Sequence, residues 1–331
     1  MFKIVHLFIS AMVVICFTAC NLEKARPNKH QYLIIASDCL YTKDTLLFKS
    51  FKKREEIKVR ILHISADSIL KKIKTEGVNC EIDAVILSSV YDMNNLGKAN
   101  VLQVIPKENF PVELPNKHIS QSRTWAGIGI DPYVLFTKDD TLQKIKTYRN
   151  LLKGSKWCSN LSKETNWYPF YSFIVKKIGP KSKFNAKNWI TQFENNKQNN
   201  LSFSDSIGPC KIYLTAFSRY RADKSNRNSV YKKGKLVFPN QHIGGSYYNM
   251  VCFGIVKQAP NFTNGIKFFH YILLKSVNDR LNNALNQFPI NSDEASVYAY
   301  QQNYRFKKYH TSPVQLVTYY ERLKTILGSL D

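Results

Sequence analysis

The side chains of this chain that could act as nucleophiles and bases are scattered along the sequence. Cys158 is followed by Ser159, and Ser246 ends the run Gly244-Gly245-Ser246, so either Cys158 or Ser246 could be nominated as a nucleophile. A hydrolase would pair it with a base and an orienting group, and the candidate bases are His63, His118, His242 and His270. Neither nucleophile lies in a G-x-S-x-G turn, and the sequence has no G-x-G-x-x-G, P-loop or H-E-x-x-H motif. The pattern predicts a protein that is not an enzyme and carries no catalytic cofactor.

The cysteines do not form a metal-binding or redox motif. After Cys20 they are widely spaced and odd in number, namely Cys39, Cys80, Cys158, Cys210 and Cys252. Because no C-x-x-C pair occurs, the spacing excludes a zinc ribbon and a thioredoxin motif. One disulfide and a set of isolated buried thiols both remain open.

The amino-terminal segment has the pattern of an export signal. Lys3 precedes an apolar run over residues 4–17, which is shorter than the ~20 residues that a bilayer span needs. Phe17-Thr18-Ala19-Cys20 then resembles a bacterial lipobox, in which the cysteine becomes the acylated first residue. We therefore expect a signal peptide over 1–19, lipidation of Cys20 and a tether over 20–31 that links the protein to a membrane. An ordinary signal with an incidental cysteine and an uncleaved anchor are the alternatives.

The composition indicates a globular, basic protein of two domains. The chain has 331 residues, 44% of them hydrophobic, and 48 Lys+Arg against 24 Asp+Glu give a net charge of +24. At ~150 residues per domain, the length suggests two domains. The basic residues are dispersed and the chain is expected to be exported, so nucleic acid is not an expected partner. The basic residues either form a solvated surface without a partner or attract anionic lipid headgroups and ligands.

The elements of the first 100 residues alternate between strand and helix patterns. Apolar strand patterns occur at Tyr32–Ala36, Lys58–His63 and Ala84–Leu87. Helices are expected between them, with Asp44 and Asp67 as caps and Gly77 at the second helix's end. This order predicts a parallel sheet covered on both faces. Ligands bind at the carboxyl ends of such strands, here near residues 37–41 and 88–92.

The later sequence predicts a second lobe. Trp125–Phe136 is a long strand pattern that leaves the first domain, and helical patterns follow at Leu142–Leu152 and Tyr168–Ile178. A second glycine-rich crossing occurs over Val237–Gly254. Two crossings indicate two lobes joined by paired hinge segments that close around a ligand. Two domains in simple series are the alternative.

Several segments carry a resemblance to a known family when they are taken in order. They are Leu70-Lys71-Lys72-Ile73-Lys74-Thr75-Glu76-Gly77 with Asp83-Ala84-Val85, Trp125-Ala126-Gly127, Phe238-Pro239-Asn240-Gln241, Ala259-Pro260-Asn261 and Phe288-Pro289-Ile290-Asn291. Together they resemble the substrate-binding lipoproteins of bacterial ABC importers, specifically the periplasmic ferric-iron-binding type. The resemblance implies an α/β, periplasmic binding protein-like fold, with a mixed or parallel sheet in each of two lobes and paired hinge crossings between them.

The resemblance also implies an organisation and a location. Lobe one is expected over 32–128 plus 243–285, and lobe two over 129–242 plus 286–331. The protein would be a monomer, lipid-anchored on the periplasmic face of a bacterial membrane, and would deliver its ligand to an ABC importer permease.

In this family ferric iron (Fe3+) is bound as the substrate between the lobes, chiefly by tyrosines. By position, Tyr41 falls on the first-lobe tyrosine and Tyr168 on a second-lobe tyrosine. The chain departs from the family at Leu40, which stands at a histidine position. It also departs at Ser218-Arg219, which stand at a pair of adjacent tyrosines.

Two site hypotheses follow, besides a non-transport accessory role. In the first, Tyr41, Tyr168 and Tyr220 supply phenolates, and Asp131, near the position of a family arginine, supplies a carboxylate. Ferric iron prefers such charged oxygens, and a bound metal deprotonates phenols. In the second, Arg219 points into the cleft and binds another small anionic solute bidentately.

Overall fold

The first lobe is built around a sheet whose central strands are buried on both faces. The computed structural model describes residues 31–40, 45–112, 114–137, 145–152, 157–159, 161, 164–178, 186–197, 210, 212–224, 234–290 and 304–328. The expected signal peptide and Cys20 therefore lie outside the described residues, as do most of the tether and both Tyr41 and Asp44. No helix in the described part of the chain has the length and apolar character of a membrane span.

The strands of lobe one pair in both directions. Strand β1 (Tyr32–Ser37) pairs in parallel with β2 (Lys58–His63) and β3 (Ala84–Leu87). Strand β8 (Tyr248–Ile255) then runs antiparallel between β3 and β4 (Trp125–Thr137). Every residue of β3 is buried, which agrees with its continuous apolar sequence.

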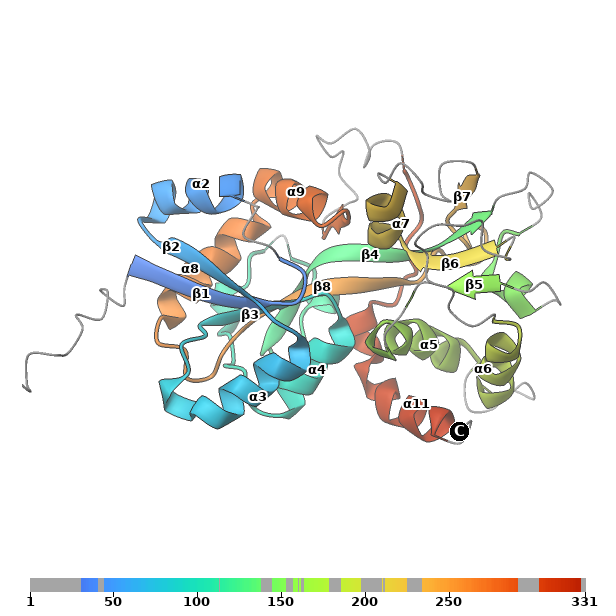
Figure 1. Ribbon diagram of the computed structural model, residues 1–331, viewed down its shortest axis with the longest axis horizontal. Coiled ribbons are helices and arrows are strands. Elements are labelled where there is room, and N and C mark those ends of the chain that lie inside the picture. The colour runs from blue at the N-terminus through green and yellow to red at the C-terminus, as the bar shows by residue number, and fades with distance from the viewer. Residues whose placement is uncertain are drawn as a thin grey trace, which may run out of the picture.

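Helices cover both faces of this sheet. In Figure 1, α2, α8 and α9 lie together on one face, and α3 and α4 lie on the other. Their bounds are α2 (Thr45–Glu55), α3 (Ala66–Glu76), α4 (Val90–Lys98), α8 (Phe262–Leu273) and α9 (Lys275–Ala284). Short 3₁₀ turns occur at η2 (Gly77–Asn79), η3 (Lys107–Asn109) and η4 (Asn116–His118).

The second lobe continues the sheet through the far half of β4. That half pairs antiparallel with β6 (Ile212–Ala216) and β7 (Lys235–Val237), and β5 (Trp157–Ser159) adds to β6 in parallel. Helices α5 and α7 lie on opposite sides of these strands (Figure 1). The remaining elements here are η6 (Tyr148–Leu152), α5 (Glu164–Ile178), α6 (Ala186–Asn195) and α7 (Phe217–Lys224). The expected α/β fold with a mixed sheet in each of two lobes is confirmed.

Strands β4 and β8 connect the two lobes. The pairing register of β4 with β8 shifts between Gly127 and Gly129, which is a bulge in the strand. A side chain at Gly129 would collide with the buried Asn282 side chain of α9, so a larger residue here would displace Asn282. The short strand β9 (Phe288–Pro289) also pairs with β4, at Gly129 and Ile130.

The end of the described chain returns to the junction of the lobes. The 3₁₀ helix η8 (Pro313–Tyr319) and α11 (Tyr320–Leu327) pack against α5 of lobe two, and η8 also packs against α4 of lobe one. Ser312 caps η8 and forms a reciprocal capping box with Gln315. The carboxyl-terminal helix therefore lies where α4 and α5 meet (Figure 1).

Two local expectations are corrected by the structure. Ser65, not Asp67, caps α3, because Ser65 has the extended backbone (φ −67°, ψ 156°) that a cap requires and its hydroxyl accepts from the amide of Ser68. Asp67 lies in the first helical turn, and Gly77 ends the helix as expected, with φ +53°. Within the range expected as a helix over 142–152, the described residues form only the 3₁₀ turn η6.

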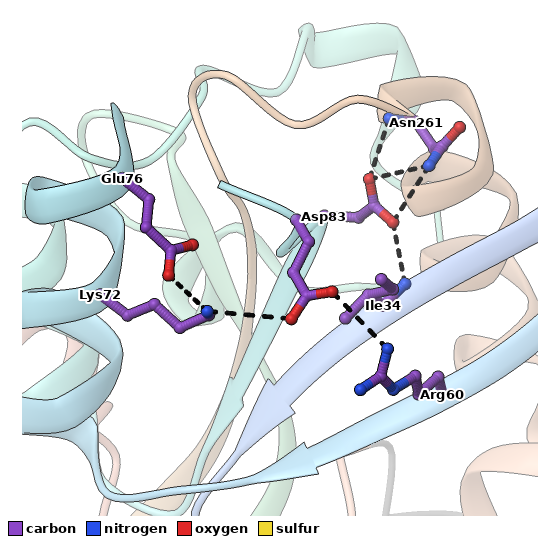
Figure 2. Close-up of polar contacts among 7 residues, drawn as sticks. Ile34, Arg60, Lys72, Glu76, Asp83 and Asn261 are labelled. Atoms are coloured by element: carbon purple, nitrogen blue, oxygen red, sulfur yellow. Dashed lines mark hydrogen bonds and ion pairs between the residues drawn. The ribbon is translucent and has the colours of Figure 1, made fainter. Parts of the chain in front are cut away.

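A buried carboxylate explains two of the motifs that carried the resemblance. Figure 2 shows Asp83 between the backbone amide of Ile34, which donates to it at 2.8 Å, and Asn261, whose amide donates at 2.9 Å. The Asn261 side-chain amide donates to the same carboxylate. Asp83 is fully buried, and burial raises its pKa. These bonds join the start of β3 to the start of α8, so the Asp83 and Ala259-Pro260-Asn261 motifs serve the fold.

Candidate functional site

The lobe-one side of the candidate site lies at the carboxyl ends of β1 and β3. Asp38 accepts hydrogen bonds from both the amide and the hydroxyl of Ser88, each at 2.8 Å. On β8, the Asn249 side chain accepts from the Val90 amide and donates to the Ser88 carbonyl. These bonds fix the loop between β3 and α4, which is one of the two regions where a ligand is expected from the strand order.

Leu40 belongs to the core and not to a ligand set. Its side chain is fully buried, and its amide donates to the Ser37 hydroxyl at 3.0 Å. The Nδ1 atom of His63 lies 3.1 Å from the Leu40 carbonyl. The segment therefore turns at Ser37 and packs Leu40 inward immediately before Tyr41, which lies outside the described residues.

Three tyrosines from three different helices meet at the junction of the lobes, and we call them the tyrosine cluster. The Tyr91 ring, from α4 of lobe one, stacks on the Tyr168 ring, from α5 of lobe two, with centroids 4.1 Å apart. Tyr320, the first residue of α11, meets Tyr91 edge-on at 5.2 Å and Tyr168 at 6.2 Å. Such aromatic pairs are favourable packing arrangements. The structure thus places Tyr168 where the two lobes touch.

Within the tyrosine cluster, burial differs from residue to residue. Tyr168 is 8% exposed and Tyr320 only 1%, whereas Tyr91 is half-buried. Burial, together with Cys252, Asp92 and Tyr91 nearby, raises the pKa of Tyr320 well above its usual value. This environment therefore favours the neutral Tyr320 hydroxyl, and a bound metal ion would favour loss of its proton.

Asp131 is held at the start of α7. Its carboxylate accepts from the amide of Ser218 at 2.9 Å and from the Ser218 hydroxyl at 2.5 Å. Gln287 donates to the same carboxylate at 3.5 Å. Burial nevertheless raises the pKa of Asp131 to about 6, because these hydrogen bonds only partly offset the loss of solvation. In this structure both carboxylate oxygens of Asp131 accept hydrogen bonds, from Ser218 and Gln287.

The other second-lobe candidates contact residues outside the tyrosine cluster. The Arg219 side chain is 60% exposed and its Nε pairs with Asp223 at 3.3 Å, so its guanidinium faces solvent. Tyr220 is buried with ring contacts to Phe136 and Phe217. The structure therefore gives Tyr168 and Tyr220 different ring neighbours, on helices that lie on opposite sides of the second-lobe strands (Figure 1).

Both nominated nucleophiles have structural roles. Cys158 forms a disulfide with Cys210, which ties β5 to the segment before β6, while Cys39, Cys80 and Cys252 are free thiols. The Ser246 hydroxyl is buried, donates to the Pro239 carbonyl at 2.8 Å and accepts from Gln241. Neither side chain is available to attack a substrate in this structure.

Phenol oxygens are the most numerous candidate metal ligands in the tyrosine cluster. Across the residues that the structure describes, no three His, Cys, Asp or Glu side chains gather into a metal site. A surface cavity of about 680 Å³ lies elsewhere, along residues 107–123, and shares no residue with the tyrosine cluster. The tyrosines of the cluster are described oxygen donors at the lobe contact, and the Asp92 carboxylate of α4 lies near Tyr320.

Comparisons with known proteins identify the fold. No family model matches the chain. Iron uptake protein A1 of Synechocystis is 22% identical over 277 residues, which cover 80% of this chain and 77% of the relative. Iron uptake protein A2 of the same organism is 20% identical over 301 residues, which cover 86% of this chain and 85% of the relative. The structure of the Trichodesmium protein IdiA (FutA) in complex with iron and citrate ligands matches with a TM-score of 0.79 and 21% identity, over 90% of this chain and 99% of that one.

The chain has the two-lobed fold of ferric-binding proteins. The resemblance that the sequence motifs indicate is thus confirmed over most of the chain. Sequence reasoning missed Tyr91 and Tyr320 as neighbours of Tyr168. Tyr91 could have been found, since it lies in the 88–92 region expected at the ligand edge. Tyr320 carried no signal, because its position depends on how the chain end returns to the lobe junction.

Proposed function

We propose that this protein is the substrate-binding component of an ABC importer and captures ferric iron, free or chelated, between its lobes. The observation that carries the proposal is the placement of Tyr168 at the lobe contact, in a chain whose fold matches over 90% of its length an iron- and citrate-bound protein. Ferric iron is a hard cation and prefers charged oxygen ligands such as phenolates. If these ligands come from both lobes, iron binding favours the closed state of the protein.

The proposed protein ligands begin with Tyr168 on lobe two and Tyr41 on lobe one. Asp131 and Tyr220 are weaker candidates, since Asp131 is occupied by Ser218 and Tyr220 packs among lobe-two rings. The exposed Arg219, paired with Asp223, argues against an anion site built on its guanidinium. A chelating anion such as citrate could complete the coordination sphere in place of missing side chains.

The proposed motion is a hinge between lobe one (32–128 plus 243–285) and lobe two (129–242 plus 286–331). Two features support these boundaries. The β4 bulge falls between Gly127 and Gly129. The second crossing contains Gly244 (φ +132°) and Gly245 (φ +103°), whose backbone conformations favour glycine. Chain segments of this kind can absorb the rotation that lobe closure requires.

The proposed location is the periplasmic face of a bacterial membrane, with Cys20 as the lipid anchor. The Cys158–Cys210 disulfide supports export, because disulfides persist in oxidising compartments. The partners would be the permease and the membrane, with the protein acting as a monomer, and no nucleic acid is expected. The disulfide at Cys158 and the buried hydroxyl of Ser246 support a binding protein and not an enzyme.

The test is a titration of metal-free protein with ferric citrate, followed by visible absorbance and elemental analysis. Ferric binding to phenolates should give a visible charge-transfer band that saturates at one iron per chain. A protein that stays colourless and iron-free would refute the proposal.

A further inference from the structure

The hydroxyl of Tyr320 is a buried polar group without a partner. Tyr320 is 1% exposed, and no group in the described part of the chain forms a hydrogen bond with its oxygen. Buried hydroxyls are nearly always hydrogen-bonded, because losing water without a replacement costs free energy. An orphaned hydroxyl inside a folded protein therefore needs an explanation, and one explanation is a ligand.

The position of this hydroxyl connects it with the candidate site. The Tyr320 ring lies 5.2 Å from Tyr91 of lobe one and 6.2 Å from Tyr168 of lobe two, between centroids. Asp92 of α4 and Cys252 of β8 are close enough to act on the Tyr320 oxygen electrostatically. The Tyr320 ring is thus at the contact between the lobes, next to the ring of the tyrosine proposed to bind iron, and its orphaned oxygen lies near Asp92 and Cys252.

The chemistry of the site needs another oxygen donor. Arg219 carries a positive charge and faces solvent, Ser218 is engaged by Asp131, and Leu40 is buried in the core. A ferric ion prefers charged oxygen ligands. Tyr320 offers such an oxygen, and coordination would give that oxygen the partner it lacks.

We propose that Tyr320 is a ligand of the captured ferric ion, supplied by the carboxyl-terminal helix beside Tyr168. The proposal rests on the proposed capture of ferric iron and names a further residue for it. As each Fe–O bond forms, the phenol proton passes to the solvent or to the chelating anion, and no electron is transferred. Tyr91, which covers Tyr168 in this structure, would have to move off that ring as the lobes open for iron to enter.

The experiment compares Tyr320→Phe with Tyr319→Phe in a titration of the full chain with ferric citrate. Tyr319 is the adjacent tyrosine, at the end of η8, and is partly exposed, so it is a matched control. We expect Y320F to weaken ferric affinity by about tenfold to a hundredfold or more, since even outer-sphere changes at metal sites cost that much. Y320F should also lower and displace the absorbance band per bound iron at saturation, and Y319F should match the wild type in both.

The outcomes separate this assignment from the function itself. Wild-type protein that binds no iron refutes the proposed function. A coloured wild type with a Y320F variant of equal affinity and identical band overturns the assignment of Tyr320 alone. Reduced affinity with an unchanged band per bound iron would also overturn it, because Tyr320 would then act through packing. A Y320F chain that fails to fold would contradict the orphaned state of the hydroxyl, on which the assignment depends.

Discussion

The Tyr91 ring of lobe one stacks on the Tyr168 ring of lobe two, with centroids 4.1 Å apart and an interplanar angle of 22°. This contact joins helices α4 and α5, which belong to different lobes, and it buries the tyrosine that the family resemblance selects. The same contact therefore stabilises the present arrangement of the lobes and covers the Tyr168 ring.

Replacing Tyr168 by Phe should weaken ferric binding sharply and leave the fold intact. The change removes the phenol oxygen but keeps the ring that packs on Tyr91 and Tyr320. A competition titration against citrate measures the affinity, and we expect a loss of about tenfold to a hundredfold or more. Tyr220→Phe is the contrasting variant. Because Tyr220 packs among Phe136 and Phe217, this variant should bind iron nearly as the wild type does. Equal losses in both variants would contradict the separation of the two tyrosines.

The Asp131 carboxyl should make the folded protein less stable as the pH rises from about 4 to 7. Burial raises its folded pKa to about 6 from the usual 3.8, so the folded state holds the proton over a range in which the unfolded chain has lost it. The free energy of unfolding therefore falls as pH rises through this window, by about 2 kcal/mol from this group.

Denaturant unfolding of the wild type and Asp131→Asn between pH 4 and pH 7 measures this effect. The Asn variant cannot ionise, so its stability relative to the wild type should increase by that amount over the window. A difference between the two proteins that does not change with pH would show that Asp131 titrates with an ordinary pKa.

Loss of the Cys158–Cys210 disulfide should destabilise lobe two. The two cysteines are 52 positions apart in the sequence, and closing a loop of that length is worth about 4 kcal/mol in the chain-entropy model. Thermal unfolding with and without reductant tests this, and reductant should lower the melting temperature of the wild type. A Cys158→Ser/Cys210→Ser variant is the control and should not respond to reductant. An unchanged wild-type melt after verified reduction would contradict the expectation.

Replacing Asp83 by Ala should destabilise the protein without changing the iron affinity of the folded chain. The change leaves the Ile34 and Asn261 amides buried without their acceptor, at a cost of about 3 kcal/mol. Glu81→Ala is the matched control two residues away, since Glu81 makes ion pairs with Arg60 and Lys72 near the surface that are worth about 1 kcal/mol or less. Urea unfolding compares the two variants, and similar losses would mean that the buried carboxylate has no special role.

Removal of the Tyr320 hydroxyl should leave the metal-free protein as stable as the wild type or slightly more stable. An orphaned buried hydroxyl costs desolvation free energy and returns no hydrogen bond, so Tyr320→Phe loses nothing in the folded state. Thermal unfolding of the metal-free proteins measures this. A melting temperature several degrees below that of the wild type would mean that the hydroxyl is hydrogen-bonded in solution.

The fold could be predicted from the sequence where one local pattern dominates. Lys58–His63 and Ala84–Leu87 form strands with the expected bounds, because alternation in the first and an unbroken apolar run in the second leave little choice. The α3 cap was misplaced by two residues, since Ser65 and Asp67 are both good capping types and only the backbone conformation decides between them.

The site could be predicted only in part, because its members come from distant parts of the chain. Tyr168 was selected by resemblance, and its placement beside Tyr91 and Tyr320 depends on how α4, α5 and α11 pack. The hydrogen bond from Ser218 to Asp131 likewise depends on the pairing of β4 with β6, and no local sequence pattern predicts it. Tyr41 remains a predicted ligand outside the described residues.

If phenol oxygens from both lobes hold a ferric ion, the visible spectrum of the iron-loaded protein should show it. Metal-free wild-type protein and Tyr168→Phe should be titrated side by side with ferric citrate while absorbance and bound iron are measured. We expect a charge-transfer band in the wild type that saturates at one iron per chain and is weakened or lost in Y168F. A wild type that binds iron without any such band, or that binds none, would contradict it.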